Sequence, residues 1–221
     1  MKNLIVPVGF RLATFALIAA VSSAVIPTAD AGTPANANAF GRTIADYMRI
    51  YQKWSFGVMP VPTDSNGNAV LDHHMVLMPT PNTPGDGTPG QQDVTLSPGQ
   101  PFVLPLFGLF GTDYTDDTPP DQFAPLSVFQ TLTITFSVDG KTEVDSSNAT
   151  KYYSAFFFSP PIAINQPPTD SVIWFQGIGI IHKALSPGEH TMQLDVANTQ
   201  PAFGSIFTYH NTWSVTVLPK N

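Results

Sequence analysis

The amino-acid sequence predicts an all-β protein, an antiparallel β-sandwich of jelly-roll or immunoglobulin-like type, with one amphipathic helix at its N-terminal side. Several short segments alternate apolar and polar residues, which is the pattern of half-buried strands. Turn formers are frequent, with 22 prolines and 16 glycines among 221 residues. Only one stretch places apolar residues at helical spacing. Together these observations favour a single β-sandwich domain over residues 40–221, with the helix laid against it.

The first 31 residues have the three parts of a signal peptide. Lys2 and Arg11 form a short cationic region, residues 12–26 are almost wholly apolar, and a small–x–small cleavage pattern ends at Ala31. The apolar run is shorter than the ~20 residues needed to span a bilayer. We therefore expect cleavage after Ala31, secretion to the periplasm or the extracellular space, and a mature chain without a membrane span.

A flexible leader, residues 32–39, is expected to precede the helix, which is predicted over residues 43–55. Within the helix, apolar and aromatic side chains share one side and charged side chains share the other. The apolar side consists of Ile44, Tyr47, Met48, Tyr51 and Trp54, and the charged side of Arg42, Asp46, Arg49 and Lys53. We interpret the charged side as a solvated surface rather than a binding patch. Prolines punctuate residues 58–90, which leaves room for one short strand over 69–78.

The clearest strand and hairpin signals begin at residue 131. Residues 131–138 alternate throughout, with Phe136 on the apolar face. Asp139-Gly140 follows, a dipeptide that favours a type I′ turn between two antiparallel strands. Residues 141–144 are therefore predicted to return as the second strand of a hairpin.

Further strands are predicted after this hairpin. Residues 171–181 are apolar on both faces, as expected for a central strand that is covered on both sides, and residues 152–158 are similar. Alternation returns over residues 191–196. The final segment, residues 203–217, alternates in the same way as one long or bent strand.

A series of motifs follows in order along the chain: Tyr47-x-x-x-Tyr51-x-x-Trp54, Leu96-Ser-Pro-Gly, Val138-Asp-Gly-Lys141, Leu185-Ser-Pro-Gly and the closing Thr208-Tyr209…Val215-Thr-Val217. This series resembles a family of uncharacterised secreted bacterial proteins, in which a Tyr/Trp-rich helix precedes a β-sandwich. The chain departs from the family in lacking cysteine and in having one Trp in the helix where two are usual. The resemblance covers most of the mature chain and implies export and the sandwich fold. It implies no catalytic residue, because no function is assigned to the family.

Composition argues against several classes of function. The absence of cysteine excludes disulfide scaffolds, zinc–thiolate sites, iron–sulfur clusters and thiol nucleophiles. A net charge of -7 with only 9 Lys and Arg argues against a nucleic-acid partner. The sequence contains no nucleophile elbow, P-loop, dinucleotide-binding glycine motif or H-E-x-x-H zinc motif. These observations favour a non-catalytic role and leave an enzymatic one open.

Aromatic side chains are the candidate binding residues. We single out Trp54, Tyr114 and Trp174, with Tyr152 and Tyr153 as further candidates, because amphipathic rings at a surface can stack on sugars. Each ring also fits a place in the core. The leading hypothesis is a secreted, non-catalytic β-sandwich that binds glycan or other material of the extracellular space or the cell envelope. The sequence leaves the oligomeric state open.

An acidic loop supports two alternative functions. Asp113, Asp116, Asp117 and Asp121 lie close together, and no Lys or Arg occurs between Lys53 and Lys141. These carboxylates could bind calcium, a hard cation that prefers oxygen ligands, in a calcium-stabilised surface protein. They could equally serve a secreted hydrolase with its acids at 113–121. The remaining interpretation is that the like charges splay into water. Calcium is the only cofactor that the sequence suggests.

The five histidines do not predict a metal site. His73 and His74 are adjacent, so on a strand they would face opposite sides. His182 and His190 flank the second Leu-Ser-Pro-Gly turn: a two-residue loop would place them on opposite faces, and a three-residue loop on one face. In either case we expect ordinary surface or turn histidines, because copper or zinc needs further convergent ligands.

Overall fold

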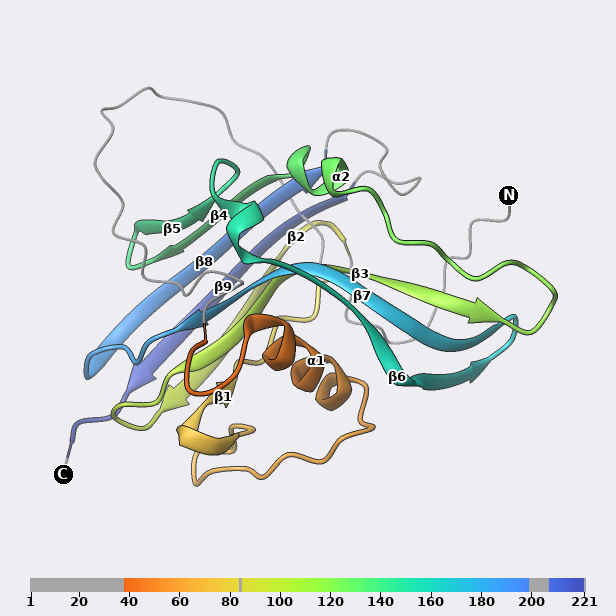
Figure 1. The fold of residues 1–221 in the computed structure, drawn as a ribbon. Helices are drawn as coiled ribbons and strands as arrows, with labels where there is room; N and C mark the ends of the chain where they lie inside the picture. The colour runs from red at the N-terminus through yellow and green to blue at the C-terminus, as the bar shows by residue number, and fades with distance from the viewer. Residues whose placement is uncertain (1–37, 84, 199–206, 221) are drawn as a thin grey trace.

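The computed structural model describes residues 38–83, 85–198 and 207–220. It consists of two packed β-sheets with one helix on the outer face of the smaller sheet (Figure 1). The predicted β-sandwich with an N-terminal helix is thus confirmed, whereas the finer class, jelly-roll or immunoglobulin-like, stays a prediction. The predicted signal peptide, residues 1–31, and residues 32–37 of the predicted leader lie outside the described residues. Ala39, the last residue of that leader, forms a β-bridge with Arg42.

The helices are α1 (Ile44–Ser55) and the short α2 (Leu126–Gln130), and the 3₁₀ turns are η1 (Asp72–His74) and η2 (Ala149–Tyr152). The strands are β1 (Val76–Leu77), β2 (Asp86–Leu96), β3 (Phe102–Tyr114), β4 (Thr133–Val138), β5 (Lys141–Asp145), β6 (Tyr153–Gln166), β7 (Thr169–His182), β8 (Gly188–Asn198) and β9 (Phe207–Val217). In the described part of the chain, no helix is both long and apolar enough to cross a bilayer.

The two sheets are mixed, which corrects the prediction of a purely antiparallel sandwich. The strand order is β1-β3-β7-β6 in the four-stranded sheet and β2-β9-β8-β4-β5 in the five-stranded sheet. Strand β1 runs parallel to β3 and β2 runs parallel to β9, while the other pairs are antiparallel. Alternation of polar and apolar residues reports which face of a strand is buried and says nothing about the direction of its neighbours.

Helix α1 begins at a capping box, as its sequence allows. The Thr43 hydroxyl accepts a hydrogen bond from the Asp46 backbone N–H, and the Asp46 carboxylate accepts one from the Thr43 backbone. The apolar side of the helix is buried against the four-stranded sheet, as predicted. Gly179 of β7 permits this close contact, because a Cβ atom there would lie 2.5 Å from the sulfur of Met48. The helix therefore covers the outer face of β7.

The core between the sheets confirms the predicted alternation of β4. Phe136 is fully buried there together with the other apolar residues of the strand. Asp139 and Gly140 have φ angles of 51° and 75°, the left-handed conformations that a type I′ turn requires. Strand β7 is buried on both faces, with Phe175 under α1 and Ile178 between the sheets, as predicted for residues 171–181.

Three segments differ from the prediction. The strand expected over 69–78 is interrupted by η1, so that only β1 remains of it. Strand β2 begins inside the proline-rich segment and contains Pro89, which is tolerated because β2 lies at the edge of its sheet. Residues 152–158, predicted to be covered on both faces, contribute to β6, which is also an edge strand. Phe157 in this strand is exposed.

Candidate functional site

The aromatic candidates from the sequence occupy different environments. Trp174 and Tyr152 are buried, so their rings are not available for stacking on a ligand at the surface. Trp54 is half-buried near the C-terminal end of α1. Tyr114 is also half-buried, and its hydroxyl donates a hydrogen bond to the Asp121 carboxylate at 3.1 Å. The structure therefore removes Trp174 and Tyr152 from the set of contact residues.

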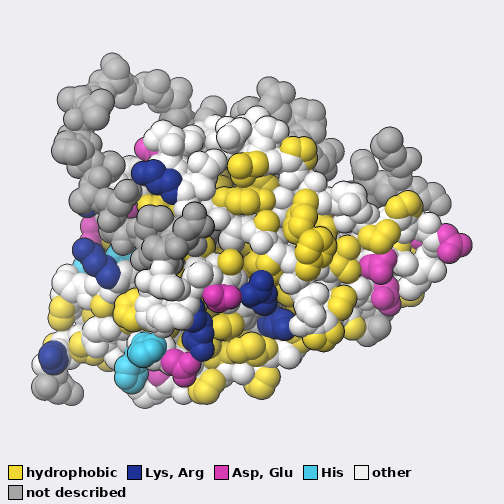
Figure 2. Space-filling view, viewed as in Figure 1, with side chains coloured by type: hydrophobic (Ala, Val, Ile, Leu, Met, Phe, Trp, Pro, Cys, Tyr) yellow, Lys and Arg dark blue, Asp and Glu magenta, His cyan; other side chains and the backbone are white. Residues whose placement is uncertain are grey.

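The aromatic surface of the protein is formed by other residues, namely Phe123, Leu126 and Phe157. Phe157 is 60% exposed, and Phe123 and Leu126 are 37% and 45% exposed. The rings of Phe123 and Phe157 meet edge to face, with centroids 4.7 Å apart. Figure 2 shows hydrophobic side chains gathered on this side of the molecule beside α2. We call these three residues the aromatic surface.

The aromatic surface lies where the four-stranded sheet projects past its partner. In Figure 1 the ends of β3, β6 and β7 continue beyond the five-stranded sheet. Phe156 and Phe158 face the α1 side of the sheet, and alternation directs Phe157 to the opposite side. On that side, residues 121–129 rather than the five-stranded sheet cover part of the projecting ends of these strands.

The covering segment, residues 121–129, is held to β7 by side chains; we call it the strap. The indole N–H of Trp174 donates to the carbonyl oxygen of Asp121 at 2.7 Å. The amide of Gln176 accepts from the backbone N–H of Ala124 at 2.7 Å and donates to the carbonyl of Ala124 at 2.9 Å. Both side chains are buried. Buried hydrogen-bonded groups hold one arrangement of the backbone, so the strap is fixed in place.

The fixed strap positions the ring of Phe123. This ring lies 5.0 Å from that of Trp174 and also contacts Phe157. Tyr153, a further candidate from the sequence, is half-buried below the strap and contacts the ring of Phe129 at 5.0 Å. Trp174 and Tyr153 thus support the aromatic surface from beneath rather than forming its exposed face.

Sequence reasoning missed Phe157 because apolar residues on both faces of 152–158 were interpreted as double burial. A signal for a different interpretation stands directly after the segment. Pro160 and Pro161 remove two backbone donors, and prolines within a sheet are found on edge strands. An apolar residue on an edge strand has fewer neighbours to cover it. No comparable signal marks Phe123, whose position depends on the strap.

The acidic loop does not bring its carboxylates together. Asp121 accepts hydrogen bonds from the backbone N–H and the hydroxyl of Thr112, each at 2.9 Å. Asp113 and Asp116 each accept one from a nearby backbone N–H, and Asp117 has a φ of 59°. Among the residues that the structure describes, no three Asp, Glu or His side chains are placed to hold a metal ion. The geometry does not support a calcium site here, and calcium binding stays a prediction.

The hydrolase hypothesis gains no support from the shape of the surface. A hollow of about 540 Å³ lies between the turn at Ser97 and residues 218–220. Its lining contains no carboxylate and no histidine side chain. The acidic residues at the end of β3 and in the loop after it do not contribute to this lining.

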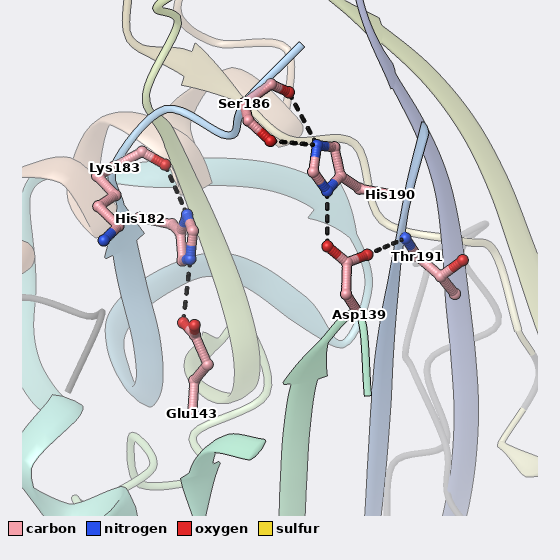
Figure 3. A network of polar contacts seen from close by, with 7 residues as sticks. All are labelled: Asp139, Glu143, His182, Lys183, Ser186, His190 and Thr191. Carbon is pink, nitrogen blue, oxygen red and sulfur yellow. Dashed lines mark hydrogen bonds and ion pairs between the residues drawn. The ribbon is translucent and has the colours of Figure 1, made fainter. Parts of the chain in front are cut away.

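Histidine–carboxylate pairs form a second polar feature, around the connection between the two sheets (Figure 3). His182 is the last residue of β7 in the four-stranded sheet, and His190 lies near the start of β8 in the five-stranded sheet. Residues 183–187, which join β7 to β8, are here called the crossover. Both loop geometries considered from the sequence were therefore wrong, because each assumed a hairpin within one sheet.

His182 pairs with Glu143 in the interior. The Nε2 atom of His182 lies 3.0 Å from Oε2 of Glu143, and the two side chains are 2% and 7% exposed. The contact does not have the angles of a hydrogen bond, and neither atom has another hydrogen-bonding partner. The His182 ring also stacks on Phe102, with centroids 4.8 Å apart.

A β-bulge turns Glu143 into the core. In the pairing of β4 with β5, Thr142 lies opposite Ser137 and Val144 opposite Phe136. Glu143 is therefore the extra residue between two paired positions, and both it and Val144 are buried. A bulge of this kind redirects a side chain that regular alternation would send to the other face.

His190 pairs with Asp139 at the surface. Its Nδ1 lies 2.7 Å from Oδ2 of Asp139, and its Nε2 lies 2.8 Å from the carbonyl oxygen of Ser186. Partial burial lowers the pKa of His190, but the hydrogen bonds to Asp139 and Ser186 and the charges of Asp139 and Glu189 together raise it. Burial likewise raises the pKa of Asp139, but the hydrogen bonds from His190 and Thr191 and the charge of His190 hold this pKa below its ordinary value.

The remaining histidines lie elsewhere. His210 of β9 contacts Asp195 of β8 in a third, partly exposed pair. His73 and His74 lie in η1 and are exposed, in agreement with the prediction of turn histidines. No sequence signal marks any of the three pairs, because each joins residues that are far apart in the sequence.

Comparison with known families and with curated proteins finds no match for this chain. No model of a known protein family matches it, and no curated protein is similar to it in sequence. The resemblance to secreted bacterial proteins with a Tyr/Trp-rich helix therefore stays a prediction. Any statement about function depends on the geometry of the described residues.

Proposed function

We propose that the protein is a secreted, non-catalytic β-sandwich that binds polysaccharide of the extracellular space or the cell envelope through its aromatic surface. The observation that carries this proposal is the exposed ring of Phe157, 60% accessible and flanked by the ring of Phe123. Large apolar side chains that cluster at a surface mark sites of binding. The predicted signal peptide is consistent with a partner outside the cytoplasm.

The size of the aromatic surface favours a saccharide over a protein partner. Stable protein–protein interfaces engage about 20–30 residues on each side. The aromatic surface contains three large apolar side chains, Phe123, Leu126 and Phe157. A pair of rings presents a platform suited to one or two sugar units, whose apolar faces can rest on aromatic carbon.

The support beneath the rings also fits a binding role. Hydrogen bonds from Trp174 and Gln176 hold the strap, and the strap holds Phe123. A ring that is ordered before binding loses little conformational freedom when a ligand arrives. The fold therefore presents a surface that is already arranged for contact.

The test is retention of the purified mature protein on insoluble polysaccharides, together with a glycan array. We compare the wild type with Phe157→Ser and with a matched control, Val58→Ser, because Val58 is 51% exposed but lies in the loop after α1. Burying a ring is worth ~1.5–3 kcal/mol, so Phe157→Ser should weaken retention about tenfold or more. The control should bind as the wild type does.

Two results would overturn the proposal. One is a wild-type protein that no polysaccharide retains, including the case in which it associates only with envelope proteins. The other is unchanged retention of Phe157→Ser, which would place any saccharide contact elsewhere on the molecule.

A further inference from the structure

The crossover carries a serine beside the surface histidine–carboxylate pair. The Oγ atom of Ser186 lies 3.4 Å from Nε2 of His190, and Nδ1 of the same imidazole lies 2.7 Å from Oδ2 of Asp139. Figure 3 shows the three side chains in this order, from the crossover to the β4–β5 turn. A hydroxyl, an imidazole and a carboxylate placed in this order can activate the serine as a nucleophile.

The carboxylate of Asp139 determines which nitrogen of the neutral imidazole holds the hydrogen. Its other oxygen accepts a hydrogen bond from the backbone N–H of Thr191 at 2.9 Å, so the carboxylate is held in place. An ionised carboxylate only accepts hydrogen bonds. In neutral His190 the hydrogen therefore lies on Nδ1, facing Asp139, and Nε2 has a free lone pair.

This lone pair needs a donor, and Ser186 supplies one. Two oxygen atoms of Ser186 face Nε2 of His190, the carbonyl oxygen at 2.8 Å and the hydroxyl oxygen at 3.4 Å. A carbonyl oxygen only accepts, so it is the partner of the protonated imidazole. Of these two oxygens, only the hydroxyl can donate to the neutral imidazole. Loss of the proton thus directs His190 to the hydroxyl of Ser186.

We propose that Ser186 is a nucleophile that an activated ester acylates once, with His190 as its general base and Asp139 as the residue that orients the imidazole. Ser186 is exposed, so an ester can reach its hydroxyl. Oγ forms a bond to the carbonyl carbon of the ester while the hydroxyl proton passes to Nε2. The bond to the leaving oxygen then breaks, and this oxygen keeps the electron pair and receives the proton. The products are an acyl ester of Ser186 and one alcohol or phenol.

The residue after Ser186 restricts the reaction to activated esters and to a single acylation. In α/β-hydrolases, the backbone N–H of the residue after the nucleophile stabilises the oxyanion. Here this residue is Pro187, which has no N–H. Without this donor, attack requires a good leaving group such as a phenolate. Water attacking the acylated serine meets the same barrier with a poorer leaving group, so the acyl group stays. The reaction modifies the protein, is compatible with a non-catalytic role and does not depend on the aromatic surface.

Acylation should become faster as the pH rises. Burial lowers the pKa of His190, but its hydrogen bonds to Asp139 and Ser186 raise it. The charges of Asp139 and Glu189 also raise this pKa, which lies above the ordinary value of 6.5 as a result. The residue opposite on β9, Val215, is uncharged. His190 therefore holds its proton in acidic medium and becomes a base as the pH rises through the raised value.

The chain contains an internal control, because the tetrapeptide Leu-Ser-Pro-Gly occurs twice. Ser97 has the same place in the first copy as Ser186 has in the second. The residue four positions later is Pro101 in the first copy and His190 in the second. The hydroxyl of Ser97 accepts a hydrogen bond from the side-chain amide of Asn66 at 3.2 Å. Ser97 thus has the same turn sequence without the base.

The experiment treats the purified mature protein with p-nitrophenyl acetate at about pH 6 and about pH 9, on either side of the histidine range. Peptide mass spectrometry locates the acetyl group, and comparison with Ser186→Ala gives the p-nitrophenol released by this serine. We expect one acetyl group on Ser186, formed faster at the higher pH, and none on Ser97 in the same time. In His190→Gln, acylation of Ser186 should be about 10²-fold slower, the size of a general-base contribution.

A pH profile tests the positioning role of Asp139. In Asp139→Asn the negative charge beside His190 is lost, so the pKa of His190 should fall and acylation should begin at lower pH. The maximal rate should also fall, because the amide can hold the imidazole with its hydrogen on the wrong nitrogen. A purely structural role of Asp139 would lower the rate without moving the pH at which acylation begins.

Three results would overturn the proposal. The first is equal acylation of Ser186 and Ser97 in the wild type, a comparison that does not depend on the folding of any variant. The second is a wild-type rate of acylation at Ser186 in His190→Gln. The third is release of more than one equivalent of p-nitrophenol that depends on Ser186, because this would show turnover in place of a single acylation.

Discussion

The two ends of the four-stranded sheet are held by different kinds of contact. At the end of β7 that carries His182, this residue contacts Glu143 of the β4–β5 hairpin, and His190 at the start of β8 contacts Asp139 of the same hairpin. Towards the other end, near Trp174, backbone hydrogen bonds, ring contacts and the hydrogen bonds that the Asp121 carboxylate accepts from Thr112 hold the strap. His190, whose pKa is raised, lies at the first end, so this end should respond to pH near neutrality. The second end should be sensitive to what covers its exposed rings.

Burial sharpens this contrast. The His182–Glu143 pair lies in the interior, where removing one partner leaves an unpaired polar group or charge. Phe157 lies on the surface, where replacing an apolar group changes stability little. The polar end therefore contributes to stability through matched partners, while the exposed part of the aromatic end contributes mainly to contact with other molecules.

The largest effect is expected from breaking the buried pair. Glu143→Leu should lower the free energy of unfolding by about 3–5 kcal/mol, since it leaves His182 without its partner. The double variant His182→Leu/Glu143→Leu should recover much of this loss, because apolar replacements of both partners restore a matched interior. Chemical denaturation of the two variants measures the difference. If the single and the double variant are equally destabilised, the loss comes from altered packing and not from an unpaired His182.

A smaller effect is expected beneath the aromatic surface. Trp174→Phe keeps a ring but removes the indole N–H that binds the Asp121 carbonyl. We expect a loss of about 1–3 kcal/mol, the cost of leaving an acceptor unsatisfied. Increased hydrogen exchange should be confined to the strap, residues 121–129. If exchange increases equally at the hairpin β4–β5, the two ends are not independent.

The pH dependence of stability gives the next effect in size. The raised pKa of His190 contributes stability that is lost as pH rises, and the lowered pKa of Asp139 contributes stability that is lost as pH falls through that value. The full contribution thus lies between the ordinary values of 3.8 and 6.5. Because Asp139 is half exposed, the contribution of this pair to the free energy of unfolding should be under about 1 kcal/mol.

Thermal melting from mildly acidic to alkaline pH tests the same comparison by the stability of the whole protein. The Tm of the wild type should fall from mildly acidic to alkaline pH more steeply than that of Asp139→Asn, which removes the charge beside His190. Trp174→Phe, at the other end, should keep the wild-type slope despite its lower Tm. Equal slopes of Tm against pH in the wild type and in Asp139→Asn would show that the His190–Asp139 pair does not contribute to the pH dependence.

The smallest effect on stability is expected from the most exposed ring. Phe157→Ser should change the free energy of unfolding by no more than about 0.5 kcal/mol, as is usual for surface substitutions. The same variant should show the largest loss of polysaccharide retention. A strong loss of stability would mean that Phe157 supports the fold, and its effect on retention would then not identify a contact residue.

The sequence predicted the elements whose signals are local. Apolar spacing placed the helix within one residue of α1, and Asp139-Gly140 predicted the turn of the hairpin. The burial of Phe136 followed from alternation alone. Each of these features depends on neighbours within a few positions, where propensity and periodicity are informative.

The features that the sequence did not predict depend on distant partners. The tetrapeptide Leu-Ser-Pro-Gly occurs at 96–99 and at 185–188, and in both places it lies where the chain passes between the sheets. The sequence indicated a turn in each case but not which sheet would receive the next strand. For the same reason the pairing of His182 with Glu143, and the strap over Trp174, could not be predicted.

The position of β9 has a consequence for how the protein is made. This strand lies between β2 and β8, and Leu96 of β2 pairs with Val217 of β9. During synthesis, β2 therefore waits for its partner until the chain has been elongated to β9, because contacts so distant in sequence form late. A chain whose larger sheet cannot close early remains extended for longer. If the protein is exported as we propose, this delay would place the final closure of the sandwich after the chain has crossed the membrane.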